Sequence, residues 1–188
     1  QETPASARSL PLLLKAVMTA GADQDLLRVI EFVQSSPEEF HLESAQVPTL
    51  KSIMPWATKR FGSASPHLLK WLADVRQELE LATATEPQPP ADWARPADVH
   101  CTCQYCGQLK TFLADPDRET GRIAAREDRR QHVISTIRQH RCDVSHTLER
   151  KGSPHSLKLT KTTGSYKEAL KRYKTDQKLL ASLPQNES

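Results

Sequence analysis

The stretch that organises this chain reads Cys101-Thr102-Cys103-Gln104-Tyr105-Cys106-Gly107. Three of the four cysteines of the protein lie within these seven residues. A Cys-x-x-Cys-Gly turn directs two sulfurs towards one cation, and the glycine relieves the backbone where the chain turns. The neighbouring Cys101 offers a third sulfur. The stretch therefore predicts a structural metal site with zinc as the cofactor.

Three residues further along the chain compete to be the fourth ligand. His132 precedes the apolar Val133 on a predicted helix, so its ring can point towards the core. Cys142 and His146 are four residues apart and would give a Cys₃His site with Cys103 and Cys106. We rank His132 first, His146 second and Cys142 third. The predicted ligands are thus Cys101, Cys103, Cys106 and His132, with His146 as the alternate fourth ligand.

Other interpretations of the cysteine stretch are weaker. Three unliganded cysteines in an exposed turn would be open to oxidation. A redox-active Cys-x-x-Cys pair normally follows a strand, and no strand is expected before this stretch. A site closed by four protein ligands favours structure over catalysis. The sequence also shows no P-loop, paired carboxylates or Ser-His-Asp order. We therefore predict a non-catalytic module, in which the metal supplies folding free energy that a small core cannot.

Composition limits the size of any single core. The chain has 188 residues, of which 37% are hydrophobic and 5% aromatic, so one large core is not expected. No apolar stretch approaches the roughly 18 residues that a membrane helix needs, and we expect no membrane partner. Clustered reduced cysteines without a signal peptide predict an intracellular protein, nuclear or cytoplasmic.

The predicted fold is mainly α, with a small α+β zinc module. Residues 9–84 carry helical apolar periodicity and predict a helical bundle, interrupted near Pro48 and Pro55. Residues 85–99 form a proline-rich linker. Residues 100–183 form the zinc-binding basic module, and residues 184–188 a disordered tail.

Within the predicted module, the cysteine turn leads into a short helix that stops at Asp115-Pro116. A long helix is then expected from about Ile123 to His140. A β-hairpin follows, with its turn at residues 151–154, and the last helix begins at a Ser165 capping box.

Charge is divided unevenly along the chain. Residues 1–100 contain 9 Lys and Arg against 13 Asp and Glu, a net charge of −4, whereas residues 101–188 contain 17 against 10, a net charge of +7. Such asymmetry predicts an acidic partner for the second half, such as DNA or RNA. Arginines at positions 118, 122, 126, 129 and 130 recur at helical spacing and predict a basic stripe on one helix. The predicted nucleic-acid-binding residues are Arg122, Arg126, Arg129, Arg130, Lys158 and Lys161.

An alternative function fits the same charge pattern. The acidic helical half and the basic module could dock each other, another protein or the remainder of a larger chain. In that case the chain would be a protein–protein interaction or scaffold region.

The residues from Trp93 to Leu180 resemble a cysteine-rich C-terminal region of large proteins related to the 2-oxoglutarate/Fe(II)-dependent oxygenases. The matching positions are Asp92-Trp93, Cys101, Cys103, Cys106, Leu109, Phe112-Leu113-Ala114, Arg129-Arg130, His132, Thr147, Glu149-Arg150, Gly152-Ser153-Pro154, Leu157 and Lys161-Thr162. The resemblance implies that the three cysteines and His132 recur, that His146 is often present, and that position 142 is often not cysteine. Oxygenase activity is not implied, because this chain lacks the His-x-Asp/Glu pair with its distal His and Arg. The resemblance implies an accessory region of a larger protein.

Overall fold

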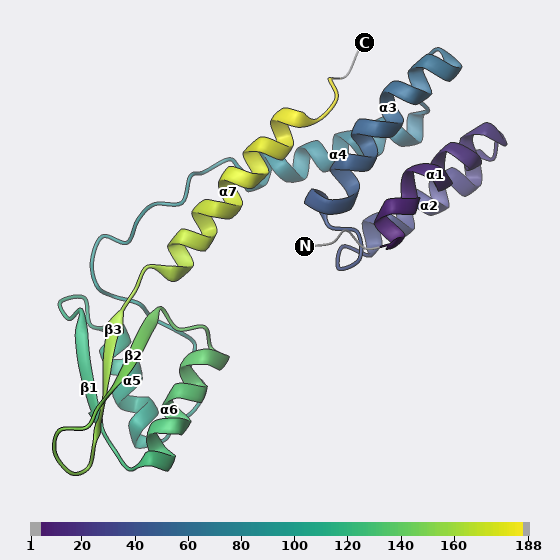
Figure 1. Ribbon diagram of the computed structural model, residues 1–188. Helices are drawn as coiled ribbons and strands as arrows, with labels where there is room; N and C mark the ends of the chain where they lie inside the picture. Colours follow the sequence, from purple (N-terminus) through teal and green to yellow (C-terminus); the bar gives the residue numbers. More distant parts are fainter. Residues whose placement is uncertain (1–4, 186–188) are drawn as a thin grey trace. The chain divides into compact units, whose positions relative to one another are not determined.

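The computed structural model describes residues 5–185 and divides the chain into two units (Figure 1). Of the described residues, 5–86 and 171–185 form the helical unit, and 87–170 form the sheet unit. Helices dominate, and a small antiparallel sheet accompanies them, so the mainly α fold class is confirmed at this level. In the described residues, no helix is long and apolar enough to cross a membrane.

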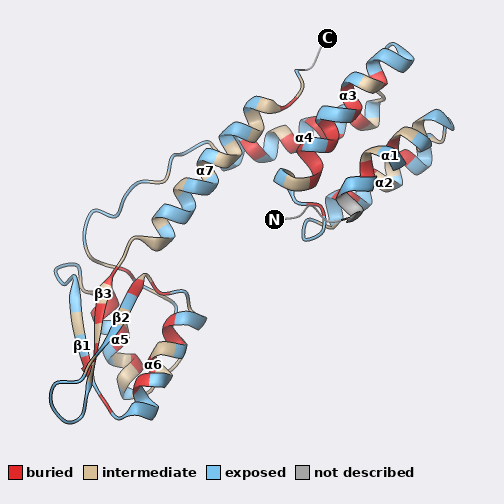
Figure 2. Ribbon diagram, in the orientation of Figure 1, coloured by how far each residue is buried: buried red, intermediate tan, exposed pale blue. Residues whose placement is uncertain are grey.

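The helical unit is built on five elements and the end of a sixth. These are α1 (Ala5–Thr19), α2 (Asp23–Ser35), the π-helix η1 (Leu42–Gln46), α3 (Val47–Phe61), α4 (Pro66–Ala82) and the C-terminal part of α7 (Gly164–Ser182). Trp71 and several leucines from these helices are fully buried (Figure 2). Buried Gln46 joins this core by hydrogen bonds, since it accepts from the Trp71 indole at 3.0 Å and donates to the Phe40 carbonyl at 2.9 Å.

The predicted interruption near Pro48 and Pro55 is wrong. Pro48 occupies the first turn of α3, where no intrahelical partner is required for its missing N–H. Pro55 lies inside the helix, which continues to Phe61 although one backbone hydrogen bond is lost. The helix persists because Ile53, Met54 and Ala57 on either side of this proline are buried in the core.

Residues 171–185 belong to the helical unit. Leu183 is buried in the helical core, and Leu179 and Leu180 pack against it. The Arg76 guanidinium also donates to the Pro184 carbonyl at 2.8 Å. The prediction that residues 100–183 form one module therefore fails for its last part, because apolar packing assigns residues 171–183 to the helices. Of the predicted tail at 184–188, residues 186–188 lie outside the described residues.

The sheet unit packs two helices on a three-stranded antiparallel sheet. Its elements are α5 (Gln104–Ala114), β1 (Thr120–Ala124), α6 (Glu127–Gln139), β2 (Val144–Glu149), β3 (Ser156–Lys161) and the start of α7. The strand order is β1-β3-β2. One face of the sheet presents Ile123, Leu157 and Leu159 to a core shared with α5 and α6. The predicted hairpin is present as β2 and β3.

The predicted long helix from Ile123 to His140 is wrong in its first part. Residues Thr120–Ala124 form β1, which pairs with β3, and α6 begins only at Glu127. Arg118 consequently lies in a loop, Arg122 on a strand and Arg126 at the helix N-cap. The predicted arginine stripe on one helix does not exist.

Candidate metal centre

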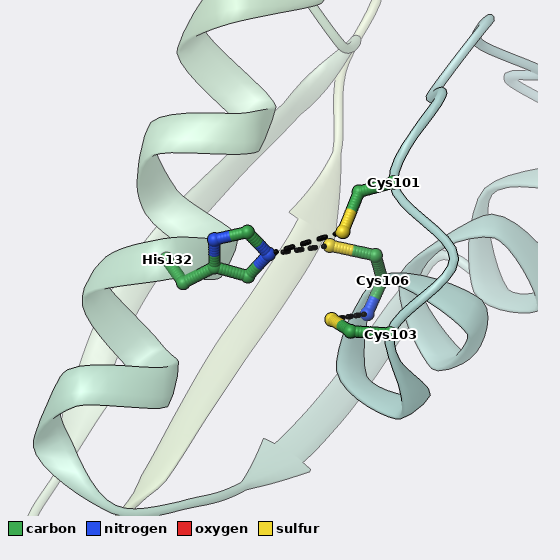
Figure 3. Close-up of side chains that lie close together, drawn as sticks. All are labelled: Cys101, Cys103, Cys106 and His132. Carbon is green, nitrogen blue, oxygen red and sulfur yellow. Dashed lines mark hydrogen bonds between the residues drawn. The ribbon is translucent and has the colours of Figure 1, made fainter.

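The cysteine stretch forms the entry into α5. Cys103 is the N-cap residue of this helix, and its sulfur accepts from the Cys106 backbone N–H at 3.5 Å. This local contact places Cys103 and Cys106 side by side, while Cys101 precedes them in an extended segment (Figure 3). The helix then carries Leu109, Phe112 and Leu113 into the core of the sheet unit. The core-forming helix thereby fixes the position of the sulfurs.

The fourth member of the cluster comes from α6. The Nε2 atom of His132 lies 3.3 Å from the Cys101 sulfur and 3.3 Å from the Cys106 sulfur. Figure 3 shows the imidazole pointing at these two sulfurs. One ligand atom from each of Cys101, Cys103, Cys106 and His132 lies within 4.8 Å of all the others.

These separations fit a tetrahedral metal ion. Zn–S bonds of about 2.3 Å and Zn–N bonds of about 2.0 Å place neighbouring ligand atoms about 3.5–3.8 Å apart. The donors of the cluster are three sulfurs and one imidazole, a set that suits zinc rather than magnesium or calcium. Buried Cys106 and half-buried His132 anchor the cluster in the core, whereas Cys101 and Cys103 are partly open to solvent.

The surroundings of the cluster shift the pKa values of Cys103 and Cys106 in opposite directions. The hydrogen bond from the Cys106 N–H is the main reason why the pKa of the Cys103 thiol falls to about 6. Burial raises the pKa of the Cys106 thiol to about 11. Cys103 is therefore a thiolate at neutral pH, and Cys106 must release its proton when a cation binds.

One neighbour of the cluster escaped the sequence-based prediction. The hydroxyl of Thr136 donates to the His132 carbonyl at 3.0 Å and lies 3.5 Å from the Cys106 sulfur. Thr136 is buried and follows His132 by one helical turn, so both side chains lie on the same face of α6. This four-residue spacing is the sequence signal that could have identified it.

The alternate ligands lie away from the cluster. His146 is on β2, directly opposite Leu159 of β3, and is not among the grouped donors of the described residues. Cys142 is buried in the core of the sheet unit with a free thiol, and burial raises its pKa. Of the three candidates for the fourth position, His132 is the one that lies beside the three cysteines.

The predicted nucleic-acid-binding residues separate into buried and exposed groups. Arg130 and Lys161 are only 9% and 3% exposed. The Arg130 guanidinium donates to the Ala125 carbonyl at 2.5 Å. The Lys161 ammonium donates to the Asp115 carbonyl at 2.5 Å and lies 4.7 Å from the centre of the Phe112 ring. Both cations donate to interior carbonyls and are not available at the surface.

The remaining four predicted residues are Arg122, Arg126, Arg129 and Lys158. Arg122 pairs with Glu149 at 2.9 Å, and both Arg126 and Arg129 pair with Asp128. Arg122 and Lys158 face each other across β1 and β3, on the sheet face opposite to the core. Lys158 forms no ion pair with any described residue.

Comparisons with known proteins identify no relative. No family model, no curated protein and no solved structure matches this chain. The resemblance to the oxygenase-related region stays a prediction, and the functional argument depends on the geometry of the chain itself.

Proposed function

We propose that the sheet unit is a zinc-stabilised, non-catalytic accessory module whose basic outer surface binds nucleic acid. The observation that carries the first part is the convergence of Cys101, Cys103, Cys106 and His132 on one point. Four protein ligands occupy every position of a tetrahedral ion, so no position is left for a substrate or an activated water. Zinc would join the start of α5 to α6 and hold the helical layer together.

Metal analysis of the purified chain tests this part. We expect one zinc per chain, and loss of that equivalent in Cys103→Ser and in His132→Ala. The matched controls are Cys142→Ser and His146→Ala, which replace the same residue types outside the cluster and should keep the metal. Full zinc content in His132→Ala together with loss in His146→Ala would contradict the proposed ligand set.

Nucleic-acid binding is supported by charge and by the outer face of the sheet. The sheet unit, residues 87–170, contains 14 Lys and Arg against 10 Asp and Glu, a net charge of +4. The face opposite the core consists of Thr120, Arg122, Ala124, Ser145, Thr147, Glu149, Ser156, Lys158 and Thr160. Cations and hydroxyls of this kind contact phosphates, whereas base stacking needs aromatic side chains that this face lacks. The proposed contact is therefore with the phosphate backbone, independent of sequence.

Salt dependence tests the nucleic-acid part. With a labelled 20-base-pair duplex, each phosphate contact contributes about 0.9 to the slope of log affinity against log salt. Lys158→Ala should weaken binding and reduce the slope by about 1, while Lys59→Ala on α3 serves as a control of equal charge change. Binding that is independent of salt would contradict the proposed nucleic-acid binding, and so would equal effects of the two variants. Neither result would bear on the proposed zinc site.

A further inference from the structure

A groove lies beside β1, which is an edge strand of the sheet. We infer that this groove binds an extended segment of another protein with alternating apolar and acidic residues, which adds a fourth strand to the sheet. The inference concerns a protein partner and depends neither on the identity of the metal nor on nucleic-acid binding.

The backbone of β1 has one free side. The odd-numbered residues along β1 form the hydrogen bonds to β3. At the two ends of the strand, the Lys161 N–H donates to the Glu119 carbonyl and the Ala125 N–H donates to the His155 carbonyl. In an antiparallel pair the intervening residues point their N–H and C=O groups away from the partner strand. These residues are Thr120, Arg122 and Ala124, and all three are exposed. They form an open template for another strand.

The groove provides space for side chains next to this template. It has a volume of about 470 Å³ and lies between α5 and β1, a size in the range of ligand sites in proteins. Phe112, Ile123 and Leu159 contribute apolar lining, and Thr111 borders it from α5. A strand added to β1 would place every second side chain on the α5 side of the sheet, in this groove.

The alternate side chains of such a strand would meet positive charge. Arg118 and Arg122 border the groove, and their side chains are 72% and 68% exposed. Each guanidinium carries five N–H donors, of which Asp115 and Glu149 engage only some. The Arg122 side chain lies on the outer face, next to the outward side chains of an added strand. Acidic residues at those positions would complement it.

The same charge argues against a second copy of this chain as the occupant. Antiparallel pairing of two β1 strands through their free sides would place Arg122 opposite Arg122 at the centre. Like charges directly opposite each other destabilise a strand pair. An acidic segment of a different protein is therefore the better partner.

The test uses the full chain and a fluorescent peptide with the sequence Ser-Val-Glu-Val-Glu-Val-Ser. The key comparison is between Arg122→Ala, which removes the side chain, and Arg122→Pro, which also removes an outward N–H while leaving the bonds to β3 in place. We expect Arg122→Pro to bind about tenfold more weakly than Arg122→Ala, the upper range for one hydrogen bond. A peptide with lysine at both glutamate positions should bind at least tenfold more weakly.

Two further variants keep the result interpretable. Leu148 holds the equivalent outward position on β2, at the other edge of the sheet, so Leu148→Pro should leave binding unchanged. Thr111→Trp fills the groove from α5 and should abolish binding even if Arg122→Pro is unstable.

Each contrary outcome overturns the inference. These outcomes are no binding of the acidic peptide at 1 mM, equal binding of the lysine peptide, or loss of binding in Leu148→Pro instead of Arg122→Pro. A concentration-dependent dimer that Arg122→Pro abolishes would show that a second copy occupies the edge.

Discussion

The helical unit and the sheet unit reach a stable core by different means. Among the residues whose burial the structure describes, the helical core contains 18 hydrophobic ones, including fully buried Trp71 and several fully buried leucines. The sheet core contains 13, and two of these are the cysteines Cys106 and Cys142. Large apolar side chains each contribute about 1.5–3 kcal/mol on burial. The difference shows that the helical unit buries more apolar side chains, and on our proposal a metal ion compensates for the smaller core of the sheet unit.

The largest effect is expected from the buried ligand of the cluster. Cys106→Ser should remove the metal and unfold the sheet unit, because structural zinc supplies about 10–16 kcal/mol of apparent binding free energy at pH 7. Far-ultraviolet circular dichroism should still show the helices of the other unit. Cys142→Ser is the control, since it replaces a buried cysteine of the same core without removing a ligand. A fully folded, metal-free Cys106→Ser variant would contradict the proposal that the sheet unit depends on a metal ion.

The reverse experiment removes apolar area from the helical unit. Trp71→Ala should cost about 3–5 kcal/mol, because it leaves a cavity and removes the donor that satisfies Gln46. Zinc content should stay at one per chain, because the ligands belong to the other unit. Denaturant unfolding and metal analysis of the same sample measure both quantities, and loss of zinc would show that the two units are not independent.

A smaller effect tests the packing of the sheet unit. A Cβ atom on Gly121 would lie 2.6 Å and 2.8 Å from two ring atoms of Phe112. Gly121→Ala should therefore destabilise the unit by about 1–3 kcal/mol through overpacking. Gly107→Ala is the matched control, because a Cβ there meets no atom within 4 Å. Thermal melting of the zinc-loaded variants should show a lower midpoint only for Gly121→Ala.

The smallest effect concerns the pH dependence of the sheet unit. Burial lowers the pKa of Lys161 from its ordinary value of 10.5. The unfolded state therefore binds more protons between the lowered pKa and 10.5, and stability should rise with pH across that window. Lys161→Met should remove this rise while keeping the contact with Phe112. Denaturant unfolding at pH 8, 9 and 10 measures the free energy of unfolding of the original protein and of Lys161→Met. The same dependence on pH in both proteins would contradict the expected contribution of Lys161.

The parts of the fold that the sequence predicts are those with local signals. Helical apolar spacing identifies α4, and the spacing of Cys101, Cys103 and Cys106 identifies the cluster. The strand β1 escapes prediction because it is five residues long and its one arginine, Arg122, lies at helical spacing from Arg118 and Arg126. Arg130 donates to the His155 carbonyl and Lys161 to the Asp115 carbonyl, 25 and 46 residues away, and only the folded chain brings these groups close. Long-range partners of this kind leave no periodic signal in the sequence.

Amide hydrogen exchange before and after metal chelation tests the central claim most directly, because it reports on both units in one sample. A chelator should remove one zinc per chain and abolish protection in α5, α6 and the sheet. Protection in α3 and α4 should persist. Unchanged protection of α5 and α6 in protein shown to contain no metal would contradict the claim that a metal ion organises the sheet unit.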